Sequence, residues 1–233
     1  SDSPHAKAVM KLSLPYVTKL LIPWIIPKSD FKEFGINQRN IIQYRAIDAG
    51  IIIRNHKKRE RKRVDNKKTI LIRPEESEAA YVNKKSITKK IVKKIVTEFP
   101  NEEKIVLSRY KEQTKDLKKT FGREIKIISK PVSGQEILSH IDCFIGSGGT
   151  MTAEAGLLGI PTISLNAVPN RIEDYLVKNK IIVRSESPNR ISREIFQALN
   201  DENVMKKRKQ KARKLVSSFE DPYQVLLRTI REL

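Results

Sequence analysis

The sequence is poor in the side chains that build disulfides and most protein metal sites. It contains 1 cysteine and 3 histidines in 233 residues. The single cysteine, Cys143, excludes an internal disulfide and a cysteine-based metal cluster, and cysteine-poor composition is typical of cytoplasmic proteins. His5, His56 and His140 are scattered along the chain and supply no ligand set, so no metal site is predicted.

Long hydrophobic runs are also missing. The most apolar stretch, residues 12–26, contains two prolines and Lys19. A helix that spans a bilayer needs about 20 apolar residues, so this stretch is predicted to be buried core, with a membrane-touching edge anchored by Trp24 as the alternative. No signal-peptide pattern is present. Because the chain begins with Ser1 rather than Met, we expect that some N-terminal sequence is missing.

Acidic residues are in deficit. The chain has 27 Asp and Glu against 47 Lys and Arg, a formal net charge of +20. Three blocks carry this excess: Arg54–Lys68, Lys84–Lys94 and Lys206–Lys214. Such fields attract nucleic acid, anionic lipid or phosphorylated ligands. None of the blocks contains an aromatic side chain on which bases could stack, so a solvated surface is favoured over specific nucleic-acid binding.

From Thr69 onward, short apolar runs alternate with longer amphipathic ones. Six alternations predict an α/β domain with a doubly wound parallel sheet, of Rossmann-like type. The predicted strands are residues 69–72, 104–108, 124–128, 142–145, 162–165 and 181–183. The predicted helices are residues 86–99, 112–121, 134–140, 150–158, 171–178, 190–199, 204–217 and 221–233.

The beginning of the chain has a different pattern. It contains a predicted helix at 6–14, a strand at 19–22 and a loop toward 44–49. This is too little for an independent domain, so it is interpreted as the remnant of a first, incomplete domain. The predicted organisation is therefore residues 1–55 as the end of that domain, 56–68 as a charged linker and 69–233 as the Rossmann-like domain.

The most informative segment starts at Gly146. A predicted strand ends in Gly146-Ser147-Gly148-Gly149, and a predicted helix follows. Such a turn places free backbone N–H groups and hydroxyls at a helix N-terminus, the arrangement that holds a phosphate. In doubly wound sheets, ligands bind at the carboxyl ends of the strands, where this turn lies. Glu154 lies two turns into the helix, too far from its start to be a simple cap.

Three common motifs do not fit this turn. It lacks the third glycine of the dinucleotide fingerprint, and no Gly-Lys-Ser or Gly-Lys-Thr of a P-loop follows. Ser147 lacks the glycine spacing of a nucleophile elbow. Arg73 and Arg109 close two other predicted strands at the same edge of the sheet, where a guanidinium suits a phosphate bidentately. Surface ion pairs are the alternative role for both arginines.

The glycine segment resembles the donor-binding segment of GT-B-fold sugar-nucleotide enzymes. It is similar to that of UDP-N-acetylglucosamine 2-epimerases and of the peptidoglycan N-acetylglucosaminyl transferase, in which a Ser-Gly pair precedes a glutamate with the spacing of Ser147 to Glu154. Most of the chain resembles an uncharacterised, mainly archaeal GT-B-type family. The matching runs are Ser1-Asp2-Ser3-Pro4, Ile72-Arg73-Pro74-Glu75, Ala80-Tyr81, Arg109, Gly148-Gly149-Thr150-Met151-Thr152, Glu154-Ala155 and Gly159-x-Pro161.

The resemblance implies a site for a UDP-sugar, as substrate or ligand, with no tightly bound cofactor. Glu154 would accept from the ribose hydroxyls, and Asp2 would stand in the place of a catalytic carboxylate of the epimerases, as the candidate catalytic residue. The epimerases carry a histidine where this chain reads Arg73-Pro74-Glu75, which weighs against epimerase chemistry. The residues implied to bind the diphosphate are Ser147, Gly148, Gly149, Thr150, Thr152, Arg73 and Arg109.

Together these features favour the nucleotide-sugar-binding half of a GT-B-type, glycosyltransferase-like protein. UDP-linked N-acetylhexosamine is the expected ligand, and a missing or separately encoded N-terminal half is the expected partner. Whether the chain is itself an enzyme is left open, with glycosyl transfer as the first reaction and epimerisation as the second. The non-enzymatic alternative is a basic module that binds nucleic acid or an anionic membrane.

Overall fold

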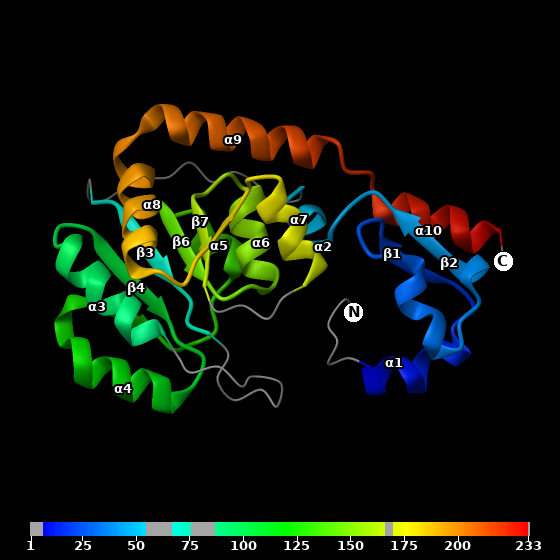
Figure 1. Ribbon diagram of the computed structural model, residues 1–233, viewed down its shortest axis with the longest axis horizontal. Coiled ribbons are helices and arrows are strands. Elements are labelled where there is room, and N and C mark those ends of the chain that lie inside the picture. Colours follow the sequence, from blue (N-terminus) through cyan, green and yellow to red (C-terminus); the bar gives the residue numbers. More distant parts are fainter. Residues whose placement is uncertain (1–6, 55–66, 76–86, 166–169, 233) are drawn as a thin grey trace.

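The computed structural model describes residues 7–54, 67–75, 87–165 and 170–232. Its centre is a six-stranded, all-parallel sheet with the strand order β5-β4-β3-β6-β7-β8 (Figure 1). The order reverses between β3 and β6, so the crevice at the carboxyl ends of these two strands is the topological switch point. The strands are β3 Thr69–Ile72, β4 Glu103–Leu107, β5 Lys126–Ile128, β6 Cys143–Gly146, β7 Thr162–Ser164 and β8 Val183–Arg184.

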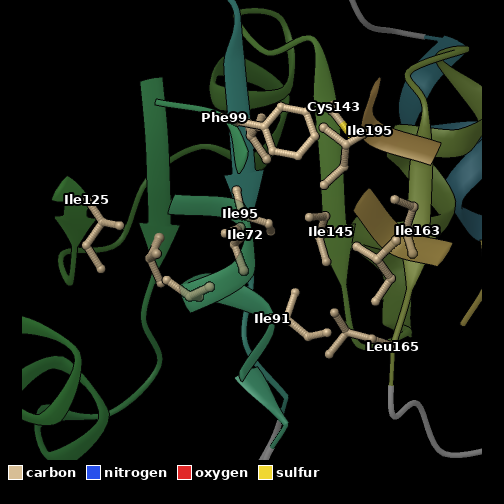
Figure 2. Packing of buried hydrophobic residues seen from close by; sticks show 14 of the residues in the cluster. Ile72, Ile91, Ile95, Phe99, Ile125, Cys143, Ile145, Ile163, Leu165 and Ile195 are labelled. Atoms are coloured by element: carbon tan, nitrogen blue, oxygen red, sulfur yellow. The ribbon is translucent and has the colours of Figure 1, made fainter. Parts of the chain in front are cut away.

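Helices cover both faces of the sheet, as the alternating pattern predicts. On one face, apolar side chains of α3, α4 and α8 pack on the central strands; Figure 2 shows Ile91 and Ile195 meeting Ile145 there. On the other face, α5 and α6 pack on Leu71 and Phe144. The helices from β3 up to α9 are α3 Thr88–Glu98, α4 Lys111–Phe121, α5 Gly134–Leu138, α6 Gly149–Leu157, α7 Arg171–Lys178 and α8 Pro188–Asn200.

The first part of the chain forms a small unit of its own. Strands β1 (Leu20–Pro23) and β2 (Ile41–Tyr44) pair in parallel over a separate apolar cluster, beside the short helix α1 (Lys7–Ser13). The predicted loop toward 44–49 is confirmed only for residues 45–47, because β2 extends to Tyr44 and α2 (Asp48–Arg54) begins at Asp48. α2 packs on α6, so the chain reaches the large sheet before residue 55.

The last two helices connect the two parts. α9 (Glu202–Ser217) runs across the large sheet unit, and α10 (Pro222–Arg231) returns to lie beside β1 and β2 (Figure 1). Phe219, at the joint between these helices, is 5% exposed and lies with its ring centroid 5.9 Å from that of Trp24. The Arg54 guanidinium donates to the carbonyls of Phe219 and Glu220 at the same joint.

Trp24 therefore lies between the two parts of the chain. Its ring meets Tyr175 of α7 edge-on at 5.2 Å, and it packs in the cluster that α2, α6 and α9 share. This position favours packing over a membrane anchor at Trp24. The predicted buried core of residues 12–26 is confirmed only in part, because Leu14, Ile22 and Ile26 are buried whereas Leu12 and Tyr16 are exposed. Residues 55–66 of the predicted charged linker lie outside the described residues, and the domain boundaries near 55 and 69 stay predictions.

We expect Gly50→Ala to destabilise the protein by about 1–3 kcal/mol, because a Cβ at this position would lie 2.6 Å from the Phe219 ring. In a solvent-exposed helix the same substitution is stabilising by roughly 0.5–1 kcal/mol. A decrease in the free energy of unfolding would therefore show that α2 packs closely against the α9–α10 joint. Urea unfolding of both proteins measures the difference. A variant as stable as the parent would show that the ring has room to move.

Candidate functional site

Three neighbouring strands bring the predicted site residues to one edge of the sheet. Ile72 of β3 pairs with Val106 of β4 on one side and with Ile145 of β6 on the other. The loops that follow these strands carry Arg73, Arg109 and Ser147, so the prediction that they share one sheet edge is confirmed at the level of topology. This edge is the switch point of the fold.

The turn after β6 requires glycine at several positions. A Cβ on Gly146 would lie 2.5 Å from the Phe144 ring and 2.6 Å from the Thr152 hydroxyl, so only glycine lets the strand end against α6. Gly148 and Gly149 have φ values of 73° and 77°, which L side chains rarely adopt. Among the described residues, no atom lies within 4 Å of the place of a Cβ on Gly149, so the backbone is exposed at this residue.

The N-terminus of α6 has no side-chain cap and no acidic residue in its first turn. Its first N–H groups have no acceptors within the helix, and the helix dipole adds partial positive charge there. Gly149 and Thr150 are exposed, and Ser147 is half-buried. Thr152 is buried, and its hydroxyl donates to the Gly148 carbonyl at 2.7 Å, so this side chain shapes the turn. Its predicted contact with a diphosphate stays a prediction.

Glu154 is a buried carboxylate on the same helix. Its side chain is 8% exposed, and desolvation raises the pKa of the Glu154 carboxyl above its ordinary value. No residue in the described part of the chain donates a hydrogen bond to it or forms an ion pair with it. A Cβ on Gly134, at the start of α5, would lie 3.9 Å from Oε2. The start of α5 thus lies close to this carboxylate, for which the described residues supply no hydrogen-bond donor.

The two arginines brace the neighbouring loops. Arg109 donates through Nε to the Pro74 carbonyl at 3.2 Å and so ties the loop after β4 to the loop after β3. The backbone N–H of Arg73 donates to the Ile145 carbonyl at 2.8 Å, which continues the pairing of β3 with β6. Both arginine side chains are half-buried. They add positive charge beside the glycine turn.

Sequence reasoning missed the role of Glu75. This carboxylate is 2% exposed and accepts the backbone N–H groups of Ile87 and Thr88 at 2.7 and 3.3 Å, together with the Thr88 hydroxyl. It caps α3 from the loop after β3, across residues 76–86, which are not among those described. The only signal in the sequence is that Ile87, an apolar residue, stands where α3 needs a cap.

A second feature that the sequence did not predict is a group of polar side chains at the ends of β7 and β8, next to the glycine turn. Ser164 pairs with Gly146 on one side and with Arg184 on the other, so their side-chain positions share one face. The Arg184 guanidinium donates to Glu173 and Asp174, both at 2.8 Å. Within the described chain, Ser164 Oγ and Glu173 Oε2 are buried without a hydrogen-bond partner. Serine at the end of an apolar strand carried no signal for this.

Asp2 and the runs at residues 1–4 and 80–81 lie outside the described residues. Among the residues that the structure describes, no group of three or more His, Cys, Asp and Glu side chains is placed to hold a metal ion. None of the described helices is both long enough and apolar enough to cross a membrane.

We expect Glu75→Gln to lower the free energy of unfolding by about 1–3 kcal/mol, because it removes the charge that caps α3 and one acceptor oxygen. Glu112→Gln is the matched control, since Glu112 is an exposed carboxylate in the first turn of α4. It should stay within about 0.5 kcal/mol of the parent. Equal stability of the two variants in urea would contradict the capping role.

We expect Glu154→Gln to stabilise the ligand-free protein at neutral pH. Because the folded-state pKa of Glu154 is raised, ionisation of this carboxyl destabilises the folded state as pH rises through that value. Below the unfolded-state pKa the carboxyl is protonated in both states, so the difference should vanish at acid pH. Thermal unfolding across this pH range tests the sign. An increase in stability that does not depend on pH, or that Glu112→Gln also shows, would mean that desolvation of the Glu154 carboxylate is not the cause of the increase.

Solved structures with similar folds are GT-B enzymes, although their sequences differ widely from this one. S. aureus TarM in complex with UDP superposes with a TM-score of 0.65 at 12% identity, over 98% of this chain and 46% of TarM. The wall teichoic acid polymerase TagF matches with a TM-score of 0.54 at 14% identity, over 93% of this chain and 56% of TagF. A UDP-N-acetylglucosamine 2-epimerase structure from Listeria monocytogenes matches with a TM-score of 0.58 at 12% identity, over 79% of this chain and 50% of the epimerase chain.

These matches establish a GT-B-like fold. A sequence relative, the uncharacterized protein MJ0665 of Methanocaldococcus jannaschii, is 28% identical over 182 residues, which are 70% of this chain and 49% of the relative. The chain thus spans about half the length of the proteins it matches. The model of the family described as "Protein of unknown function (DUF354)" matches residues 1–233, and the chain belongs to this family.

Proposed function

We propose that this chain is the nucleotide-sugar-binding half of a GT-B-type, glycosyltransferase-like protein, with a UDP-linked N-acetylhexosamine as ligand. The observation that carries the proposal is the pair of features on α6, an N-terminus without a side-chain cap and, two turns further on, the buried carboxylate of Glu154, to which no described residue is paired. A nucleoside diphosphate supplies both complements, an anion for the helix N-terminus and ribose hydroxyls for the carboxylate.

The diphosphate contacts come from the glycine turn. Backbone N–H groups of Gly148 and Gly149 and the hydroxyls of Ser147 and Thr150 are the proposed donors. Each charge-assisted hydrogen bond of this kind contributes about 1.5–3 kcal/mol. Arg73 and Arg109 are proposed to add long-range attraction, and Thr152 holds Gly148 in place.

The proposed partner is a first GT-B domain that completes the small unit at the start of the chain. A parallel pair of only two strands is unusual, because parallel sheets are normally larger and covered on both faces. Three apolar side chains beside this pair are strongly exposed: Val9 at 68%, Leu12 at 77% and Tyr16 at 88%. A catalytic base and an acceptor site are proposed to lie on that domain, and Asp2 is proposed as a catalytic carboxylate.

Glycosyl transfer is the proposed reaction of the complete protein. In such a reaction the sugar–phosphate bond breaks and negative charge develops on the departing diphosphate, which the α6 N-terminus is oriented to stabilise. The residue at the histidine position of the epimerases weighs against epimerisation, because Glu75 caps α3 from this loop. With a single cysteine, a cytoplasmic location is proposed.

Calorimetric titration with UDP-N-acetylglucosamine, UDP, ADP and pyrophosphate tests the proposal. At about 0.3 M salt, screening shortens the reach of the general basic field to roughly 5–6 Å. We expect the two uridine ligands to bind more tightly than ADP and pyrophosphate. Glu154→Gln should weaken UDP binding by about tenfold or more, and it should leave pyrophosphate binding unchanged because pyrophosphate has no ribose.

Glu112→Gln serves again as the control and should bind all four ligands like the parent. Equal weak binding of the four ligands, or no binding, would contradict a nucleotide-sugar site. Tight UDP binding that Glu154→Gln leaves intact would contradict the ribose assignment alone.

A further inference from the structure

Helix α9 carries a concentration of positive charge that the rest of the fold does not neutralise. Lys206–Lys214 holds seven basic residues and no acidic one. Arg208 pairs with Glu194 at 2.9 Å. Within the part of the chain that the structure describes, none of the other six forms an ion pair, and all six are exposed: Lys206, Lys207, Lys209, Lys211, Arg213 and Lys214.

α9 presents these charges on a rigid support. The helix is held through Ala212, which is 1% exposed, and through close contact with the turn after α6. There a Cβ on Gly159 would lie 2.8 Å from the Lys209 backbone. Most of the remaining surface of the helix faces solvent, so its charge is free to meet a partner.

α10 follows after a short turn and carries an exposed apolar stripe. Tyr223, Leu226 and Ile230 are 61%, 40% and 55% exposed, and their spacing of three and four residues places them on one face. The opposite face, with Val225 and Thr229, is buried. Arg228 and Arg231 are exposed beside the stripe. Figure 1 shows the two helices end to end along one side of the molecule.

We infer that α9 and α10 together bind the surface of an anionic membrane. A basic helix attracts anionic headgroups, and an adjoining apolar stripe enters the boundary between headgroups and acyl chains. Nucleic acid matches the charge, but it offers no apolar phase for Tyr223, Leu226 and Ile230. A second copy of the chain matches the stripe, but each copy carries the same net charge of +20 and repels the other.

Vesicle co-sedimentation tests this inference on the whole chain. We expect binding to phosphatidylcholine vesicles that contain phosphatidylglycerol and no binding to pure phosphatidylcholine. Replacing Lys206, Lys207, Lys209 and Lys211 with Gln should weaken binding by about tenfold or more. The control replaces four exposed lysines of α4 with Gln and removes the same charge: Lys111, Lys115, Lys118 and Lys119. This control should keep at least most of the affinity.

The apolar stripe is tested separately. Leu226→Ser combined with Ile230→Ser should weaken vesicle binding severalfold and leave binding to a duplex DNA probe unchanged. In Tyr223→Trp, the new indole should be quenched by brominated acyl chains. The native Trp24 provides an internal reference, because it is packed against Tyr175 and Phe219. Unchanged circular dichroism and UDP titration would show that each variant is folded.

Four results would each overturn the inference. These are equal loss of binding in the α9 and α4 variants, indifference to the Leu226 and Ile230 changes, no quenching of Tyr223→Trp, and DNA binding without vesicle binding. The last result would assign the basic face to nucleic acid. Because nucleotide-sugar binding is read out separately, failure here leaves the proposed function intact.

Discussion

The close packing of Gly146 against Phe144 and Thr152 determines the geometry of the whole carboxyl edge. Because no side chain fits at Gly146, β6 runs directly against the first turn of α6. Thr152 then holds the Gly148 carbonyl, and the backbone has positive φ at Gly148, just before the helix, and at Gly149, the first helix residue. In the register of the sheet, Gly146 pairs with Ser164 of β7, and Ile145 pairs with Ile72 of β3. Arg73, the residue after Ile72, and Ser164 therefore flank the turn.

At the carboxyl edge of the sheet, a helix N-terminus that attracts negative charge and a carboxylate that attracts hydrogen-bond donors lie within a short stretch of chain. In the described ranges of the chain, the start of α6 has no side-chain cap for its N–H groups, and Glu154 is an acceptor to which no residue donates. Burying a carboxylate without a partner costs free energy, and proteins keep such groups where function needs them. Glu75 shows the contrasting case, because its carboxylate is equally buried but fully occupied in capping α3.

Much of the large domain could be predicted from sequence because its signals are local. Apolar runs and helical spacing placed all six strands of the sheet within a few residues, and glycine marked the turn after β6. The parallel order and the shared edge of Arg73, Arg109 and Ser147 followed from the alternation alone. β2 and α2 were not predicted because both are short, and α2 depends on packing against α6. The roles of Glu75 and Thr152 were not predicted because they depend on hydrogen bonds that leave no pattern in the residue spacing.

The parallel pair of β1 and β2 also affects how the chain behaves in concentrated solution. Within the described residues these strands pair only with each other, so each leaves one row of backbone N–H and C=O groups without a strand partner. Such edges template association between molecules. The net charge of +20 opposes this association through repulsion that salt screens. The colloidal stability of the chain therefore depends on ionic strength, and high salt brings open strand edges of different molecules within reach of one another.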